Sequence, residues 1–224
     1  MPIYECSRCN DLTYSSSKAN VASCPSCGAE RRRLVEDAAS FAEAREIPRA
    51  VSHGDHSIAV FDDFEQVADI ATQFVDQALL AGGLVMAAVP QELEDMILER
   101  LHPDDRHGIA WEPPSDTYGP TFGPDLVIER FREIAELEDR PVFVLGCADE
   151  PIQHFASIEG WTRYEQMAHE TAVEYGMTVL CLYDARVHDE RMLRAGLRTH
   201  GLEVGLEDGE LRRNEAFDYE PPAA

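Results

Sequence analysis

The sequence predicts an α/β protein: a mostly parallel layered sheet with helices on both faces, preceded by a small metal-binding module. Two patterns carry this prediction. Apolar runs of strand length alternate with amphipathic helical stretches along most of the 224 residues, as expected for parallel strands buried on both faces. Near the N-terminus, four of the six cysteines form two C-x-x-C pairs.

The two cysteine pairs predict a zinc ribbon in residues 1–34. They are Cys6 with Cys9 and Cys24 with Cys27. Each pair turns the chain so that two thiolates face one centre, and two such pairs complete the tetrahedral four-sulfur site that suits zinc. A redox pair and an iron centre are the alternatives. So short a module cannot fold by apolar burial alone, so one structural zinc ion is expected to supply its folding free energy.

Charge differs between this module and the rest of the chain. The whole sequence has a net charge of −24 and a pI of about 4.5, which disfavours nucleic acid or anionic membrane as a partner of the main body. The first 34 residues hold five basic and three acidic side chains. Among them, Arg31–Arg33 offer a contact for nucleic acid or an acidic partner. The alternatives are a solvated edge and a contact with the acidic part of the same chain.

Residues 35–54 are expected to connect the module to the main domain. Val35–Ile47 is rich in alanine and glutamate and predicts a short helix, which Pro48 ends. A linker follows, and the main domain is expected over residues 55–218. The tail, 219–224, should fray.

The main domain opens on the apolar strand His56–Phe61. Apolar positions then recur every three or four residues, so Phe64–Leu80 is expected to be a helix with one apolar face. Asp62 or Asp63 is the expected N-cap of this helix. A second buried strand is expected over Leu84–Val89.

The middle of the domain continues the alternation. Pro90 begins the next helix, because proline favours the first helical turn, and Gly108–Trp111 is a short strand. The long loop Glu112–Gly123 is dense in proline and glycine, and such loops often carry binding residues. Helix Asp125–Leu137 and strand Pro141–Cys147 follow.

The last third predicts one more strand–helix unit and an ending of short strands. Helix Ser157–Tyr175 ends at Gly176, and the buried strand Thr178–Tyr183 ends at Asp184. A further helix is expected through Met192, Leu193 and Leu197, and one or two short strands within residues 202–219.

Several marks, in this order, resemble the MEDS family, a sensory domain described in methanogens and in the repressor of dichloromethane dehalogenation. The family opens on a histidine, an apolar strand and acidic residues, and it closes on a C-x-Y-D strand, a helix and a histidine. The matching residues here are His56, Phe61, Gly82, Gly83, Thr117, Tyr118, Phe122, Tyr164, Glu165, Cys181, Tyr183, Asp184, His200, Asn214 and Phe217. The chain departs from the family at residues 146–150, where Gly-Cys-Ala-Asp-Glu replaces a Gly-Glu-Met-like turn.

The resemblance implies a RecA-like core that senses a small molecule or docks a signalling protein, with the ribbon as its output. In open α/β sheets ligands bind at the carboxyl edge, so the expected ligand-binding residues there are Asp62, Pro90, Tyr118, Asp149, Tyr183 and Asp184. The resemblance adds His56 and His200, for which a structural role is the alternative. His169 and His188 are expected to be solvated, and Cys147 and Cys181 to be inert core residues.

The sequence lacks several motifs of common enzymes. No G-x-x-x-x-G-K-[ST] loop follows the first strand, and neither G-x-S-x-G nor H-E-x-x-H occurs. We therefore expect a non-enzymatic sensory or signal-transduction protein that binds a small organic ligand or a regulatory partner. The alternatives are a degenerate RecA-like nucleotide-binding or phosphotransfer protein and a ribbon-directed transcriptional regulator.

Membrane insertion is not expected. The sequence has no apolar run of the length that spans a bilayer, and its first residues lack the pattern of a signal peptide. These features predict a cytoplasmic protein.

Overall fold

The computed structural model describes residues 3–6, 12–14, 31–35, 55–117, 123–153, 155–207 and 209–218. The chain divides into two compact units, residues 1–49 and 50–224, and each is described on its own.

In the first unit, the described strands form an antiparallel sheet in the order β2-β1-β3. Val35 ends β3 instead of opening the helix expected over Val35–Ile47, and the rest of that helix lies outside the described residues. Cys9, Cys24 and Cys27 also lie outside them, as does the tail 219–224. The strands are β1 (Ile3–Cys6), β2 (Leu12–Tyr14) and β3 (Arg31–Val35).

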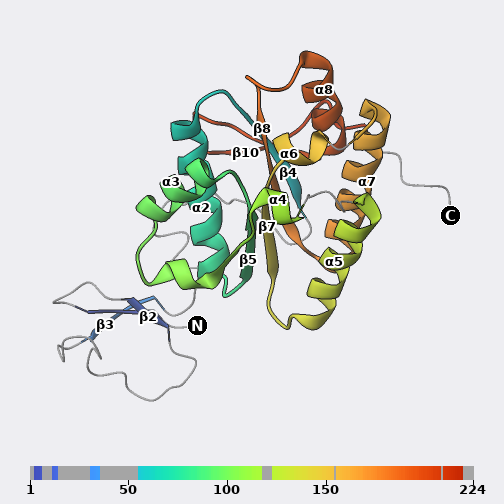
Figure 1. Ribbon diagram of the computed structural model, residues 1–224. Helices are drawn as coiled ribbons and strands as arrows, with labels where there is room; N and C mark the ends of the chain where they lie inside the picture. The colour runs from blue at the N-terminus through green and yellow to red at the C-terminus, as the bar shows by residue number, and fades with distance from the viewer. Residues whose placement is uncertain are drawn as a thin grey trace. The chain divides into compact units, whose positions relative to one another are not determined.

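A seven-stranded sheet organises the second unit (Figure 1). Its strand order is β10-β9-β4-β8-β7-β5-β6, and its neighbouring strands are parallel except for the antiparallel pair β9 and β10. The strands are β4 (His56–Phe61), β5 (Leu84–Ala88), β6 (Ile109–Trp111), β7 (Val142–Cys147), β8 (Thr178–Asp184), β9 (Leu202–Val204) and β10 (Leu211–Arg213).

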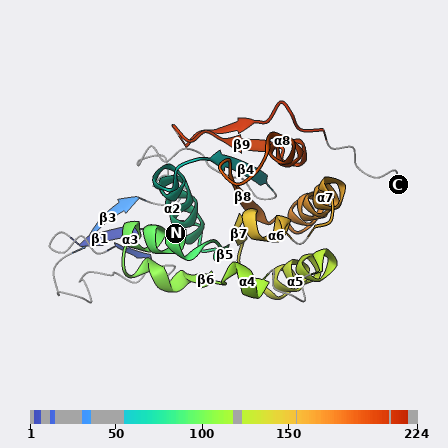
Figure 2. The same cartoon turned by 45° about the horizontal axis from the view of Figure 1, so that its top comes forward.

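Helices cover both faces of this sheet (Figure 2). Helices α2 and α3 pack on one face, and α5, α7 and α8 pack on the other. The helices are α2 (Phe64–Leu80), α3 (Gln91–Arg100), the 3-10 turn η1 (Asp105–Gly108), α4 (Pro114–Thr117), α5 (Pro124–Leu137), α6 (Asp149–Ile152), α7 (Ile158–Tyr175) and α8 (Glu190–Thr199). None of the described helices is both long and apolar enough to cross a bilayer.

Local signals place the helix ends where the sequence predicted them. Asp63 caps α2, because its carboxylate accepts the backbone N–H of Glu65 at 2.9 Å. Ser157 caps α7 in the same way through the N–H of Gly160. Gly176 ends α7 with a φ of 63°, a left-handed conformation that favours glycine. The layered α/β architecture and its alternation of strands and helices are therefore confirmed.

The pleat of β8 decides which side chains reach which face. Leu180 and Leu182 join the core under α2 and α3, whereas Cys181 and Tyr183 project toward α7 and α8. This is the period of two that any strand imposes. Since His56 on β4 lies beside β8 in parallel register, the two strands bring polar residues that are far apart in sequence to one buried face.

Candidate functional site

A cluster of polar side chains lies between the sheet and helices α7 and α8. His56 is the first residue of β4, Glu165 comes from α7, Cys181 and Tyr183 come from β8, and His200 ends α8. The two histidines, the glutamate and the tyrosine are each at most 2% exposed. Such groups are rarely buried unless they are paired, so their contacts indicate what the cluster does.

Glu165 is the centre of these contacts. Its Oε1 accepts a hydrogen bond from the hydroxyl of Tyr183 at 2.8 Å. Its Oε2 lies 3.5 Å from Nε2 of His56 and 3.5 Å from Nε2 of His200. Nε2 of His56 also lies 3.3 Å from Sγ of Cys181, and the two imidazole rings are 4.0 Å apart between centroids.

The tautomer of His200 follows from its backbone partner. Its Nδ1 lies 2.7 Å from the carbonyl oxygen of Gly196, and because a carbonyl only accepts, Nδ1 carries the proton. In the neutral ring, Nε2 is then an acceptor and faces Oε2 of Glu165. Gly196 also lets α8 approach β8, since a Cβ there would lie 2.7 Å from Cε1 of Tyr183.

Burial sets the charge states of the cluster. Desolvation raises the pKa of Glu165 to about 8, opposed by the hydrogen bond from Tyr183. Desolvation lowers the pKa of His200 to about 4. Desolvation also holds the pKa of His56 well below its ordinary value, and the nearby His200 lowers it further. Burial raises the pKa of the Cys181 thiol. At neutral pH these four groups are therefore uncharged when no further cation is present.

A pocket of about 40 Å³ adjoins the cluster between the sheet, α5 and α7. His56, Glu165 and Cys181 form its polar wall, together with Thr171. Its apolar walls include Phe131, Val144, Tyr164, Ala168, Ala172 and Met177.

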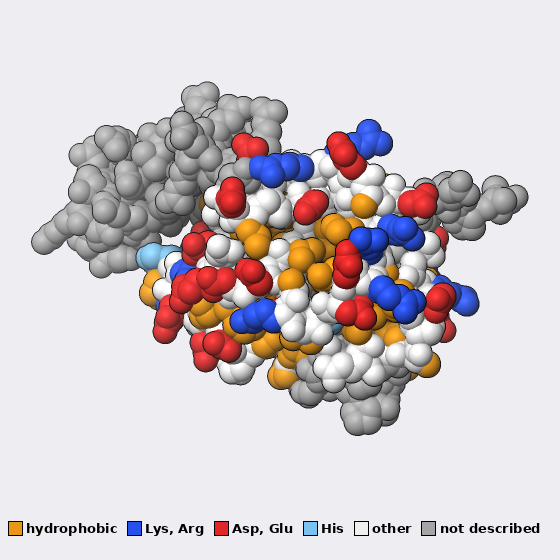
Figure 3. Space-filling model, turned by 90° about the horizontal axis from the view of Figure 1, so that it is seen from above, with side chains coloured by type: hydrophobic (Ala, Val, Ile, Leu, Met, Phe, Trp, Pro, Cys, Tyr) orange, Lys and Arg blue, Asp and Glu red, His pale blue; other side chains and the backbone are white. Residues whose placement is uncertain are grey.

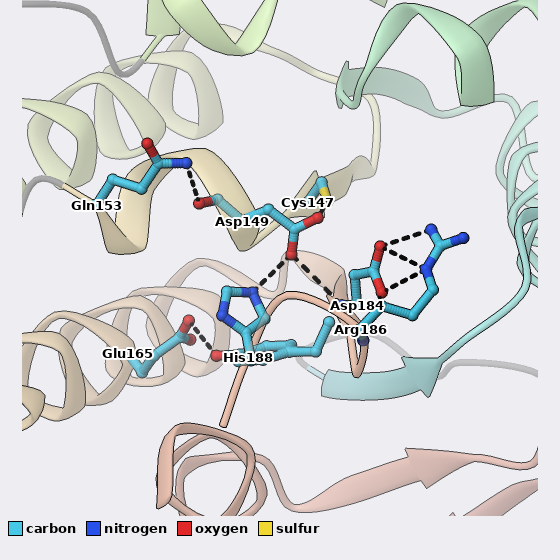
Figure 4. A network of polar contacts seen from close by, with 8 residues as sticks. Cys147, Asp149, Gln153, Glu165, Asp184, Arg186 and His188 are labelled. Atoms are coloured by element: carbon cyan, nitrogen blue, oxygen red, sulfur yellow. Dashed lines mark hydrogen bonds and ion pairs between the residues drawn. The ribbon is translucent and has the colours of Figure 1, made fainter. Parts of the chain in front are cut away.

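A second polar network lies at the carboxyl edge of the sheet, centred on Asp149 (Figure 4). Nε2 of His188 lies 2.6 Å from Oδ1 of Asp149, and the Cys147 thiol donates to Oδ2 at 3.2 Å. The backbone N–H of Asp184 also donates to Oδ1, at 3.4 Å. The network joins the end of β7 to the turn after β8.

Asp184 and Arg186 form an ion pair beside this network (Figure 4). The guanidinium donates to both carboxylate oxygens at 2.6–3.1 Å and lies 4.8 Å from the centre of the Phe64 ring. The hydrogen bonds from Arg186 hold the pKa of the Asp184 carboxyl below its ordinary value. The charge of Asp184 is therefore neutralised within its own turn.

A pocket of about 320 Å³ lies at the same edge, lined by Pro90, Asp149 and their neighbours from α3, α4 and α6. Figure 3 views the domain from this side and shows acidic and arginine side chains dispersed over exposed hydrophobic surface.

The structure divides the sequence-predicted ligand residues between two places, which corrects the expectation of one crevice. Pro90 and Asp149 share the edge pocket, and Asp184 adjoins it. The side chain of Tyr183 does not lie at the edge, because it projects from the face of β8 and joins His56 and His200 in the buried cluster. Asp62 is exposed at the end of β4, and Tyr118 lies outside the described residues.

Sequence reasoning missed three residues of these networks. His188 is 9% exposed and bonded to Asp149, so the expectation that it is solvated was wrong. Cys181 is partly buried and packs against the core, and it also contacts His56. The sequence could have revealed Glu165, because it is an acidic residue on the apolar face that Trp161 and Ala168 define on α7.

Comparisons with known proteins agree with this architecture. The flagellar accessory protein FlaH from Methanocaldococcus jannaschii has a similar fold, with a TM-score of 0.50 and 11% identity, covering 84% of this chain and 89% of that chain. The RadB recombinase is a weaker match, with a TM-score of 0.42, 13% identity, and coverage of 68% and 74%. The RecA-like α/β fold is thus confirmed.

No curated protein sequence matches the chain. A family model does match, over residues 55–201, and this range contains both polar networks. The chain therefore belongs to the MEDS family, the methanogen/methylotroph DcmR sensory domain.

Proposed function

We propose that residues 55–218 form a non-enzymatic sensory module that binds a small organic molecule in the pocket beside the buried cluster and signals to a regulatory partner. Membership of a sensory family supports this role. The observation that carries the proposal is the pocket itself, which has apolar walls and is lined by residues whose buried polar atoms have no partner within the described part of the chain. Small-molecule sites typically have this composition.

The volume of the pocket limits the size of the ligand. It measures about 40 Å³, whereas one water molecule needs roughly 10–15 Å³ by the same kind of measure. A molecule of roughly two to four non-hydrogen atoms therefore fits without rearrangement.

Two residues that line the pocket carry buried polar atoms that a ligand could pair with. Oγ1 of Thr171 and Nδ1 of His56 are buried and have no hydrogen-bond partner among the described residues. Each such group costs about 1–3 kcal/mol when it is left unpaired. A ligand with an apolar body and a single hydrogen-bonding group would satisfy one of them while its body fills the apolar part.

Nuclear magnetic resonance titrations of the full chain with methanol, ethanol, 1-propanol and 1-hexanol test this proposal. We expect saturable amide shifts at Val144, Thr171 and Ala172 with the three shorter alcohols and none with 1-hexanol. Ala168→Leu fills the pocket and should abolish the shifts. Ala135→Leu enlarges a half-buried alanine on α5 outside the pocket and should retain them. Titrations without saturable shifts for any short alcohol would reject the proposal.

We also propose that Cys6, Cys9, Cys24 and Cys27 hold one structural zinc ion and that this ribbon transmits the output. The support is their spacing, which matches a four-sulfur site. Metal analysis of the purified chain in reducing buffer tests it: the paired change Cys24→Ser and Cys27→Ser should remove about one zinc ion per chain. Cys147→Ser is the matched control and should remove none.

The N-terminus of α2 supports a module that does not hydrolyse nucleotides. In a nucleotide-binding relative this helix end would receive phosphate on free N–H groups, but here the carboxylate of Asp63 accepts the N–H of Glu65. Asp62 and Glu65 are themselves exposed acids. We expect Mg-ATP to leave the melting temperature unchanged in a thermal-shift assay, and a saturable rise would instead favour the nucleotide-binding alternative.

A further inference from the structure

We propose that His56, Glu165, Cys181 and His200 form a binding site for one divalent transition-metal ion, with zinc as the best match. The site would be distinct from the cysteine pairs of residues 1–34. The inference does not rest on the small-molecule ligand proposed above, because it uses different atoms of the shared residues and is tested with the metal alone.

The spacing of the ligand atoms supports the proposal. One ligand atom from each of the four residues lies within 4.8 Å of all the others. The individual separations from Nε2 of His56 are 3.3 Å to Sγ of Cys181 and 3.5 Å to Oε2 of Glu165. Zinc bonds of about 2.0–2.3 Å in a tetrahedron place neighbouring ligand atoms about 3.3–3.8 Å apart. Three of the six separations, those from Nε2 of His56 to Sγ of Cys181 and Oε2 of Glu165 and that from Nε2 of His200 to Oε2 of Glu165, therefore have the lengths of edges of such a tetrahedron.

Nε2 of His200 and Oε2 of Glu165 point lone pairs at each other, and a cation between them would remove the repulsion. Nε2 of His200 is an acceptor, because Nδ1 donates to Gly196. It faces Oε2 of Glu165, and neither atom has a hydrogen-bond partner among the described residues. Two buried acceptors 3.5 Å apart are destabilising without a shared proton or metal ion.

Surrounding groups already orient two of the four ligands, His200 and Glu165. The carbonyl of Gly196 holds the ring of His200, and the hydroxyl of Tyr183 holds Oε1 of Glu165. Bound histidines in metalloproteins usually donate their other nitrogen to a carbonyl or carboxylate, and ligating carboxylates are hydrogen-bonded in turn. Both supporting contacts are therefore present around these two ligands.

The donor set selects the class of metal. Two imidazoles, one thiolate and one carboxylate suit zinc and its first-row neighbours, whereas magnesium and calcium prefer oxygen ligands. Four protein ligands in a buried position are typical of a structural ion rather than one that activates water.

The competing explanation is a metal-free cluster in which Glu165 keeps a proton and shares it with His200. Metal content separates the two. The full chain carrying Cys24→Ser and Cys27→Ser, reconstituted with zinc in reducing buffer and then dialysed, should retain about one zinc ion per chain. Adding Cys181→Ser and His200→Gln should reduce this to background, whereas Cys147→Ser and His188→Gln should leave it unchanged. A chain that retains no zinc, or a cluster variant that retains as much as its parent, would overturn the proposal.

Cobalt provides a readout that does not depend on the folding of the variant that combines Cys181→Ser with His200→Gln. Titration of the metal-free Cys24→Ser, Cys27→Ser chain with Co²⁺ should produce the visible bands of tetrahedral cobalt and a thiolate-to-cobalt charge-transfer band. In Cys181→Ser the charge-transfer band should disappear while visible bands remain. Absence of any band from the chain with an intact cluster would contradict the proposal. A failed alcohol titration, by contrast, would reject the proposed ligand and leave the metal site untouched.

Discussion

Tyr183 donates a 2.8 Å hydrogen bond to Glu165, and both side chains are at most 2% exposed. The bond joins β8 to α7 inside the core. It holds the glutamate in position beside His56 and His200, so the buried cluster depends on it. The Tyr183 ring in turn lies against His200 and Trp161.

Replacing Tyr183 with phenylalanine should destabilise the domain. The change keeps the ring but leaves Oε1 of Glu165 without its donor in the core. The free energy of unfolding, measured by urea denaturation, should fall by about 1–3 kcal/mol. Tyr175→Phe is the matched control, because its hydroxyl bonds Glu136 at the surface, and its effect should be clearly smaller. Equal effects of the two changes would contradict the assigned role of Tyr183.

Gly196→Ala should destabilise the domain although alanine is the better helix former. The helix preference would favour alanine by about 1 kcal/mol. The new Cβ would lie 2.7–2.8 Å from two ring carbons of Tyr183, and such overpacking costs about 1–3 kcal/mol. We expect a lower melting temperature and an altered near-ultraviolet circular dichroism spectrum.

Gly160→Ala on α7 is the control for this prediction. The nearest atom to its new Cβ is 3.4 Å away, on the ring of Phe155, which is close to ordinary contact. The melting temperature should stay the same or rise. A similar rise for Gly196→Ala would show that α8 can move away from Tyr183 without loss.

Asp184→Asn should lower stability at neutral pH by about 1 kcal/mol. This is less than is usual for a charged hydrogen bond, because Arg186 is about half exposed. Arg186 lowers the pKa of Asp184 from its ordinary 3.8. The carboxyl of Asp184 therefore binds a proton more readily in the unfolded chain than in the folded one. The ion pair stabilises the fold fully above pH 3.8, and this stabilisation is lost as pH falls through the folded pKa of Asp184.

Urea unfolding across pH 7 to 3 measures this dependence. The difference between the parent chain and Asp184→Asn should be constant at higher pH and should shrink below about pH 4. Asp62→Asn changes an exposed carboxylate at the end of the neighbouring strand and should have little effect. A difference that grows on acidification would rule out the assigned pairing.

The contact between His188 and Asp149 should show strong energetic coupling. The pair is 2.6 Å apart, with side chains 5% and 18% exposed. A double-mutant cycle with His188→Ala and Asp149→Ala should give a coupling energy of about 1–3 kcal/mol. The exposed pair of His102 and Asp104, at 3.7 Å, is the control and should show no measurable coupling. Comparable values for the two pairs would mean that the edge network contributes nothing to stability.

Much of the candidate site at the sheet edge was predictable, because it follows from where strands end. Asp149 and Asp184 each follow or end an apolar strand, and the carboxyl ends of parallel strands meet at one edge. The caps at Asp63 and Gly176 were predictable for the same reason, since each depends on a few adjacent residues.

The buried cluster was not predictable from the same patterns. Its members His56 and Cys181 are 125 positions apart, and they meet because β4 pairs with β8 rather than with β5. Neither periodicity nor spacing specifies the order of strands in a sheet. The assignment of His188 failed similarly, because its burial depends on the carboxylate of Asp149 at the end of a different strand.

The sequence by itself determined the alternation of strands and helices, the positions of the caps and the resemblance to a sensory family, because these depend on local periodicity and on residues close together in the chain. The tertiary structure alone decided that Tyr183, Glu165 and the two histidines share one buried face, because that requires a strand order and a helix approach set by long-range packing.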